Sequence, residues 1–120
     1  MKISLNIISK LLEMGLLDDE EFSKNWAQSR ANKGKGEYIV TRELRLKGVS
    51  EININNAVDF VESDEWQRSA RRQANKKMRK FSNLKDYQRK HKIKQYLYQR
   101  GFSPDTIDAV IDDLAVEGVE

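Results

Sequence analysis

Apolar residues recur at intervals of three and four along most of the chain, whereas no window alternates convincingly between apolar and polar positions. Ile3, Ile7, Leu11 and Met14 begin this pattern near the N-terminus. The pattern predicts helices over 2–14, 18–32, 37–47 and 84–99, together with helices that begin at Ser50, Ser63 and Ser103. We therefore expect an all-α protein.

Capping residues support these boundaries. Asp18, with Glu21 three residues later, forms a capping-box pattern, in which a side chain accepts hydrogen bonds from the first N–H groups of the helix. Gly48 suits the left-handed position that follows a helix, and Pro104 suits the first turn, where its missing N–H costs least. The predicted helices thus have start and stop signals that do not depend on the hydrophobic pattern.

Two stretches of the chain end in the same way. Residues 44–50 and 97–103 both read as leucine, two variable residues, a cation, glycine, an apolar residue and serine. Apolar residues at helical spacing follow each stretch: Ile54, Ala57, Val58 and Val61 after the first, and Ile107, Val110, Ile111 and Leu114 after the second. A recurring helix stop and helix start predicts a small helical unit that is used twice.

The repeat divides the chain into units. Residues 16–62 form one three-helix unit and residues 63–120 another, which ends in an acidic tail. Residues 1–15 would then be the last helix of a preceding unit whose first two helices are absent, so we expect a fragment or a start downstream of the true one. The predicted architecture is a set of tandem three-helix repeats in an elongated, curved array. Arrays of this kind usually present an extended surface for binding a partner.

The net charge of +3 conceals a strong separation of charge along the sequence. Residues 66–100 contain 13 lysines and arginines but a single acid, Asp86, whereas residues 101–120 contain six acids and no lysine or arginine. Residues 1–65 are nearly balanced, with 9 cations and 12 acids. This asymmetry indicates a polyanion or an acidic protein surface as partner, although long helices also expose cations on a solvated face.

Composition argues against several classes of protein. The chain has no cysteine, which excludes a disulfide framework and a cysteine-based zinc site and suits a reducing compartment. No apolar run approaches the roughly 20 residues of a membrane-spanning helix. We therefore expect a soluble, cytoplasmic protein that does not bind a membrane. A monomer is the expected state, although repeat surfaces left uncovered by a missing unit could drive association.

The sequence gives only weak indications of a catalytic, metal or phosphate site. The acids at 18–21 are explained by helix capping better than by a metal site, and His91, the single histidine, has no serine or cysteine arrangement that suggests a nucleophile. Residues 33–36 alternate lysine and glycine and could hold a phosphate, but they lack the full P-loop pattern, and a turn between helices explains them better. We therefore expect no enzyme, no cofactor and no metal.

The aromatic residues also have two interpretations. Trp26 and Trp66 are assigned to the same place in their respective units, so we expect them to be core anchors rather than platforms for base stacking. Tyr87, Tyr96 and Tyr98 cannot all face one core. One or two of these tyrosines should therefore be exposed near the basic face.

Several motifs, taken in order and spacing, resemble those of the RecX family. Its central signature is similar to residues 15–22 (GLLDDEEF), 29–36 (SRANKGKG) and 43–50 (ELRLKGVS). Residues 96–103 (YLYQRGFS) are similar to the last unit of that family, in which a leucine and a basic residue precede Gly-Phe. The resemblance covers about 11–115 and implies the second and third three-helix repeats plus the last helix of the first.

The resemblance also implies a function. RecX proteins bind the RecA recombinase, in particular its filament on single-stranded DNA, and restrain its recombinase, ATPase and co-protease activities; they carry no catalytic residues. The alternative from the charge pattern is a stand-alone DNA-binding module that acts through single- or double-stranded phosphate contacts. In either case the candidate contact residues are Arg30, Lys33, Lys35, Arg42, Arg45, Lys47, Arg68, Arg71, Arg72, Lys76, Lys77, Arg79, Lys80, Arg89, Lys90, Lys92, Lys94 and Arg100.

Overall fold

A computed structural model describes residues 7–8, 10–11 and 18–117, with side chains to 114, and this part of the chain contains helices and no strand. The all-α prediction is therefore confirmed. The labelled helices are α2 (Asp19–Asn32), α3 (Glu37–Leu46), α4 (Glu51–Phe60), α5 (Ser63–Met78), α6 (Asp86–Gln99) and α7 (Pro104–Glu117). None of the helices described is long and apolar enough to cross a bilayer.

The helix expected over 2–14 falls mostly outside the described residues. Residues 7, 8, 10 and 11 are helical, whereas Ile3, Met14 and the expected stop at Gly15 are not among the residues that the structure describes. Of the predicted apolar stripe, Ile7 is half exposed, and its neighbour Ile8 is buried.

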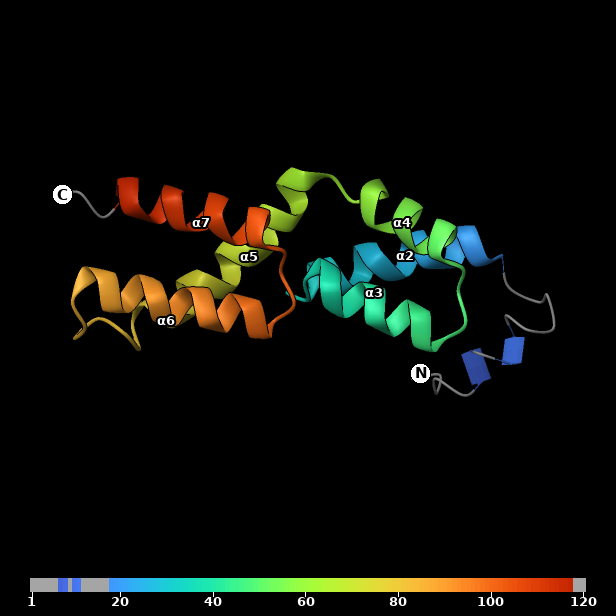
Figure 1. Cartoon of the computed structure of the whole chain (residues 1–120), viewed down its shortest axis with the longest axis horizontal. Helices are drawn as coiled ribbons and strands as arrows, with labels where there is room; N and C mark the ends of the chain where they lie inside the picture. The colour runs from blue at the N-terminus through green and yellow to red at the C-terminus, as the bar shows by residue number, and fades with distance from the viewer. Residues whose placement is uncertain (1–6, 9, 12–17, 118–120) are drawn as a thin grey trace.

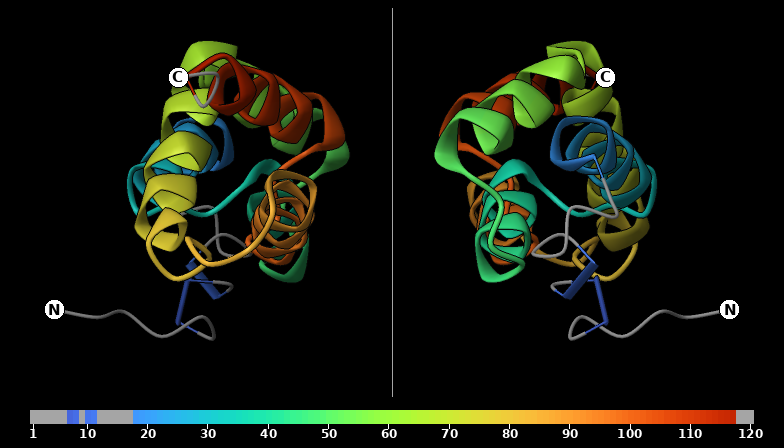
Figure 2. Two further views of the ribbon diagram at one scale, coloured as in Figure 1. Left: turned by 90° about the vertical axis from the view of Figure 1, so that its left-hand side faces the viewer. Right: turned by 90° about the vertical axis from the view of Figure 1, so that its right-hand side faces the viewer.

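The six labelled helices form two bundles of three, joined end to end (Figure 1). In the first, α2 packs against α3 and α4; in the second, α5 packs against α6 and α7, and α6 and α7 also contact each other. Viewed along the long axis, α2 lies behind α5 and α3 behind α6, so corresponding helices form columns (Figure 2). The molecule measures 56 × 23 × 20 Å, as expected for an elongated repeat array.

One continuous hydrophobic core runs through both bundles. The apolar residues predicted after the two repeated stretches all belong to it or pack against it, with Ile54 and Ala57 fully buried in α4 and Val110 almost fully buried in α7. Phe102, from the second repeated stretch, is also fully buried. Because neither small bundle needs to close its own core, the shared core lets two short units support each other.

The helix starts follow the capping predictions. The Asp18 carboxylate accepts hydrogen bonds from the N–H groups of Glu20 and Glu21, and the Ser50 hydroxyl accepts one from the N–H of Asn53. Gly48 has a φ of +85°, the left-handed conformation expected after α3. These local signals therefore set where α2 and α4 begin and where α3 ends.

One expectation about the aromatic residues needs correction. Trp26 and Trp66 do not occupy equivalent places, because Trp26 lies eight residues after the cap at Asp18 and Trp66 only four after the cap at Glu62. Trp66 is a core anchor and donates from Nε1 to the carbonyl of Val58, whereas Trp26 is only partly buried. The prediction that one or two of Tyr87, Tyr96 and Tyr98 are exposed is confirmed, since Tyr87 and Tyr98 are exposed and Tyr96 packs against the core.

A joint formed by residues 33–39 and 100–106 connects the bundles. The N–H of Gly36 donates to the carbonyl of Arg100 and the N–H of Tyr38 donates to the carbonyl of Gly101, both at 2.8 Å. The first N–H groups of α3 thus pair with carbonyls at the end of α6, which satisfies groups that both helices would otherwise leave free. Residues 33–36 are therefore a turn between helices, as predicted, and part of the contact between units.

Glu37 completes the joint. Its buried carboxylate accepts hydrogen bonds from the N–H of Ser103 at 3.2 Å, from the Ser103 hydroxyl at 2.7 Å and from the Thr106 hydroxyl at 2.8 Å. Ser103 itself caps α7, because its hydroxyl accepts from the N–H of Thr106. A carboxylate from the first bundle thus reinforces the start of a helix in the second, where negative charge is favourable.

Candidate interaction surface

The predicted contact residues separate into three groups by the surroundings of their side chains. Some are held in structural contacts, some are exposed but paired with an acid, and the rest extend from the surface. The first group cannot supply a free charge to a partner without giving up a contact within the fold. The third group is therefore the best candidate for an interaction surface.

Arg30 belongs to a partly buried cluster between α2 and α3. Its guanidinium donates two hydrogen bonds to the Glu43 carboxylate, at 2.6 and 3.0 Å, and lies 5.4 Å from the centre of the Trp26 ring. The Trp26 Nε1 donates to the same carboxylate at 3.3 Å. Arg30 thus holds α3 against α2.

Lys47 is not at the surface, where the sequence analysis placed it. The residue is 2% exposed, its Nζ lies 3.9 Å from the centre of the Trp26 ring, and that Nζ has no hydrogen-bond acceptor within the described part of the chain. Burial lowers the pKa of Lys47, an effect that nearby Glu43 opposes. The ammonium is therefore held by the face of an aromatic ring, and it cannot reach a partner from this position.

Three more cations stabilise turns and helix packing. Arg89 donates to the carbonyls that end the turn before α6, those of Phe81, Ser82 and Leu84. The guanidinium of Arg100 donates to the carbonyls of Gly34 and Lys33, just beyond the end of α2, at 3.1 and 3.2 Å. Lys77 lies 4.8 Å from the centre of the Tyr96 ring. The cations with structural contacts are therefore Arg30, Lys47, Lys77, Arg89 and Arg100.

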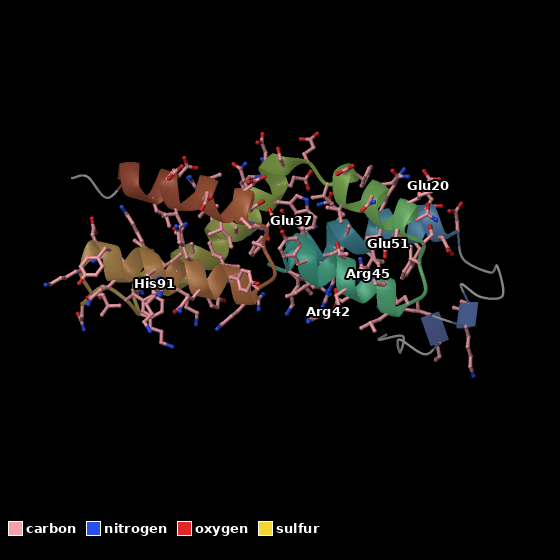
Figure 3. All side chains as sticks on the ribbon, viewed as in Figure 1. Glu20, Glu37, Arg42, Arg45, Glu51 and His91 are labelled. Carbon is pink, nitrogen blue, oxygen red and sulfur yellow. The ribbon has the colours of Figure 1, made fainter. Side chains whose placement is uncertain are left out.

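Three surface cations are paired with acids. Arg45 donates to both oxygens of Glu51, at 2.6 and 3.1 Å, and these hydrogen bonds lower the pKa of Glu51 and raise that of Arg45. Figure 3 shows this pair between the end of α3 and the start of α4. Arg71 pairs with Asp113 across α5 and α7, and Lys94 lies 3.9 Å from Asp108. Such pairs weaken the field of these cations toward a partner.

The remaining ten candidates have no ion pair with an acid in the described part of the chain and are exposed or partly exposed. Arg42, labelled on α3 in Figure 3, is one of them. This group contains Lys33, Lys35, Arg42, Arg68, Arg72, Lys76, Arg79, Lys80, Lys90 and Lys92.

Three of these cations form a row along the outside of α5. Arg68, Arg72 and Lys76 are four residues apart and all are exposed, so they lie on one face of the helix; we call this row the α5 stripe. Arg79 and Lys80, in the turn that follows, extend the positive charge beyond the end of the helix. Like charges four residues apart repel one another within a helix, so the row brings no benefit to the fold itself.

Sequence reasoning missed the contributions of two kinds of residue. Glu37 was not identified, because its partners Ser103 and Thr106 lie more than sixty positions away and no local pattern links them. Exposed tyrosines were also missed in part: the sequence could not tell which of Tyr87, Tyr96 and Tyr98 would be exposed, and it did not identify Tyr38, which is 52% exposed. The described residues contain no group of three or more histidines, cysteines or acids placed to hold a metal ion.

Comparison with known proteins shows which family the chain resembles. The model of "RecX, second three-helix domain" matches residues 18–58, and that of "RecX, third three-helix domain" matches residues 63–111. A regulatory protein RecX from Vibrio vulnificus is 36% identical over 106 residues, which cover 87% of this chain and 67% of that protein. The chain belongs to the RecX family. The predicted family is thus confirmed, together with its three-helix repeats.

Other members of the RecX family agree in sequence and in structure. A regulatory protein RecX from Enterococcus faecalis is 31% identical over 114 residues, which cover 94% of this chain and 43% of that protein. A crystal structure of RecX from Lactobacillus salivarius superposes with a TM-score of 0.80 at 26% identity, over 92% of this chain and 73% of that one. The chain spans less than half the length of the Enterococcus faecalis relative.

Proposed function

We propose that this RecX chain regulates the RecA recombinase by binding the RecA filament on single-stranded DNA. The bound chain inhibits the recombinase, ATPase and co-protease activities of the filament, by blocking its extension or by promoting its disassembly. Membership of the family supports the regulatory part of this proposal, since the relatives are named regulatory proteins and not enzymes.

The α5 stripe is the observation that carries the proposal. A RecA filament on DNA combines phosphate with acidic protein surface, so an exposed row of cations accelerates encounter and holds the complex in a salt-dependent way. Arg68, Arg72 and Lys76 are suited to this role, because no acid of the described chain pairs with them. The remaining exposed cations, such as Arg42, Arg79 and Lys80, would add to the same field.

The DNA-stimulated ATPase of RecA, titrated with this chain, tests the proposal. Wild type should lower the ATPase to a plateau. A triple variant, Arg68→Gln, Arg72→Gln and Lys76→Gln, should need about tenfold more protein for the same inhibition, because it removes cations that meet the filament and nothing that the fold uses. No inhibition by wild type at saturation would contradict the proposal.

A charge-matched control separates the position of the cations from the total charge. The variant Asn25→Asp, Asn55→Asp and Asn56→Asp changes the net charge by the same amount at exposed positions of the first bundle. It should inhibit RecA as well as wild type does. If its inhibition of RecA is weakened as much as that of the α5 triple variant, total charge and not the α5 stripe governs binding.

A stand-alone DNA-binding module is the second candidate, and the same stripe favours it. In that case the chain would bind bare single-stranded DNA with a steep salt dependence, and it would lower the ATPase only by competing for DNA. Additional DNA would then restore full ATPase activity. Inhibition that persists in excess DNA would favour direct action on the filament.

A further inference from the structure

One face of α6 carries exposed aromatic rings among cations. Tyr87, His91 and Tyr98 are all exposed, and each tyrosine is 67% exposed. At 100° per residue these side chains leave the helix within about 40° of one another, and Lys90 and Lys94 lie on the same face. We call this set, Tyr87, Lys90, His91, Lys94 and Tyr98, the aromatic face of α6.

The spacing of the aromatic face suits an extended ligand. Tyr87 and Tyr98 are separated by about 16 Å along the axis, which equals about five nucleotide steps of a stacked strand. His91, labelled on α6 in Figure 3, lies between them in the sequence. No acid follows Asp86 on α6 itself, so the part of this face around Lys90 favours an anion, whereas Asp108 of α7 offsets the charge of Lys94 at the other end.

A groove adjoins one end of this face. It has a volume of about 520 Å³ and lies between α6 and α7, with Tyr98 in its wall and the apolar side chains of Pro104 and Ile107 beside it. Lys94 and Asp108 face each other at its rim, 3.9 Å apart. The groove thus offers an apolar surface large enough for a planar ring, next to an ion pair.

The first bundle has only part of these features at the corresponding positions. Aligning the two repeated stretches places Arg45 where Tyr98 stands and Glu51 where Pro104 stands. These two side chains form an ion pair across the end of α3 and the start of α4, with two hydrogen bonds. Tyr38, which is 52% exposed, stands where His91 stands, so the first bundle keeps one exposed ring but has neither of the two tyrosines of the aromatic face.

We infer that the aromatic face of α6 binds single-stranded nucleic acid. Bases stack on Tyr87, His91 and Tyr98, and the base nearest α7 enters the groove. Lys90 contacts a phosphate, and Lys94 does so by exchanging its ion pair with Asp108 for one with the ligand. A charged surface alone would bind a duplex as readily, whereas exposed rings require unpaired bases. This inference does not rest on the RecA proposal, and its test needs no RecA.

Fluorescence anisotropy with labelled oligothymidylate tests the inference. The double variant Tyr87→Ala and Tyr98→Ala should bind at least about tenfold more weakly, since each stacked base contributes about 1–3 kcal/mol. The slope of log affinity against log salt should stay the same, because no charge is removed. Tyr87→Phe with Tyr98→Phe keeps both rings and should bind like wild type.

Two controls separate stacking from phosphate contacts. A strand of the same length with abasic sites should bind wild type about as weakly as oligothymidylate binds the double alanine variant. Among the lysines, Lys90→Gln with Lys94→Gln should reduce the salt slope, whereas Lys92→Gln, about 140° away from Tyr87 around the helix, should change it less.

The opposite results would overturn the inference. The inference would be wrong if the double alanine variant bound oligothymidylate as tightly as wild type does, or if wild type bound the abasic strand as tightly as oligothymidylate. It would also be wrong if wild type did not bind oligothymidylate at low salt. Because Tyr87 and Tyr98 are exposed, loss of folding does not explain weak binding, and a circular dichroism spectrum verifies this. Failure here would leave the ATPase test of the RecA proposal unaffected.

Discussion

At the scale of single residues, the same kind of side chain serves the fold in one place and is free for a partner in another. Arg68 and Arg72 extend into solvent, whereas Lys47 is buried against the ring of Trp26. A buried ammonium without an acceptor costs free energy, which the contact with the ring offsets only in part. Lys47 therefore contributes packing and reduces stability through its charge.

Replacing Lys47 by methionine should increase stability. Lys47→Met keeps an unbranched side chain in the same space and removes the ammonium, so the free energy of unfolding in urea should rise by about 1 kcal/mol at neutral pH. Arg42→Met, on the exposed side of the same helix, should change it by less than about 0.5 kcal/mol. A large loss of stability in Lys47→Met would show that the cation itself holds α2 and α3 together.

The lowered pKa of Lys47 also predicts a pH dependence. Between the pKa of the folded state and that of the unfolded chain, near 10.5, the unfolded chain binds more protons, so the contribution of Lys47 to stability rises with pH. The advantage of Lys47→Met over wild type should therefore shrink between neutral pH and about pH 10. If the stability difference between Lys47→Met and wild type in urea unfolding grew with pH instead, the pKa of Lys47 would not be lowered in the folded state.

At the scale of helices and turns, glycines that look alike in the sequence are needed for different reasons. Gly48 has a φ of +85°, but a Cβ there would meet nothing within 4 Å. Gly36 has an ordinary φ of −89°, but a Cβ there would lie 2.2 Å from the backbone nitrogen of Phe102. Gly48 is thus needed for its left-handed backbone conformation, whereas Gly36 is needed because the backbones of the two bundles approach closely there.

Substitutions should separate these two requirements. Gly48→Ala should cost about 1–2 kcal/mol, and Gly48→Asn less, because asparagine tolerates the left-handed region. Gly36→Ala should cost at least about 2 kcal/mol, and Gly36→Asn no less, since any Cβ must push apart two backbones. Thermal unfolding measures both series. Rescue of Gly36 by asparagine would contradict the packing argument.

The helices were predictable from the sequence and the contacts between them were not. Apolar spacing and caps at Asp18 and Ser50 placed most helices within a few residues, because these signals act within one turn. The joint depends on pairs such as Glu37 with Ser103, far apart in sequence. The error over Trp26 and Trp66 has the same origin: position within a helix decides burial, and residue type alone does not.

The candidate site was predictable as a segment but not as a surface. The basic stretch at 66–100 correctly identified α5 and α6 as rich in cations, yet it could not tell Arg72, which is exposed, from Arg89, which donates to three turn carbonyls. An arginine that caps a turn and one that meets solvent have the same sequence signature. Only the packing of α6 against the turn before it separates them.

At the scale of the whole molecule, the joint should make two small bundles unfold as one. Glu37→Gln keeps one acceptor oxygen but loses the charge that strengthens the hydrogen bonds from Ser103 and Thr106, so stability should fall by about 1–2 kcal/mol. Glu62→Gln, exposed before α5, is the matched control and should have little effect. Equal stability of Glu37→Gln and wild type would contradict a role for the joint.

The same joint connects the bundle that carries the α5 stripe to the first bundle, so we expect a partner to meet both bundles together. The most direct test is sedimentation of this chain with RecA filaments assembled on single-stranded DNA with an ATP analogue that is not hydrolysed. Wild type and the charge-matched aspartate variant should pellet with the filaments, and the variant without the α5 stripe should stay largely in the supernatant. Wild type that stays in the supernatant, or a variant without the stripe that pellets equally, would contradict the account.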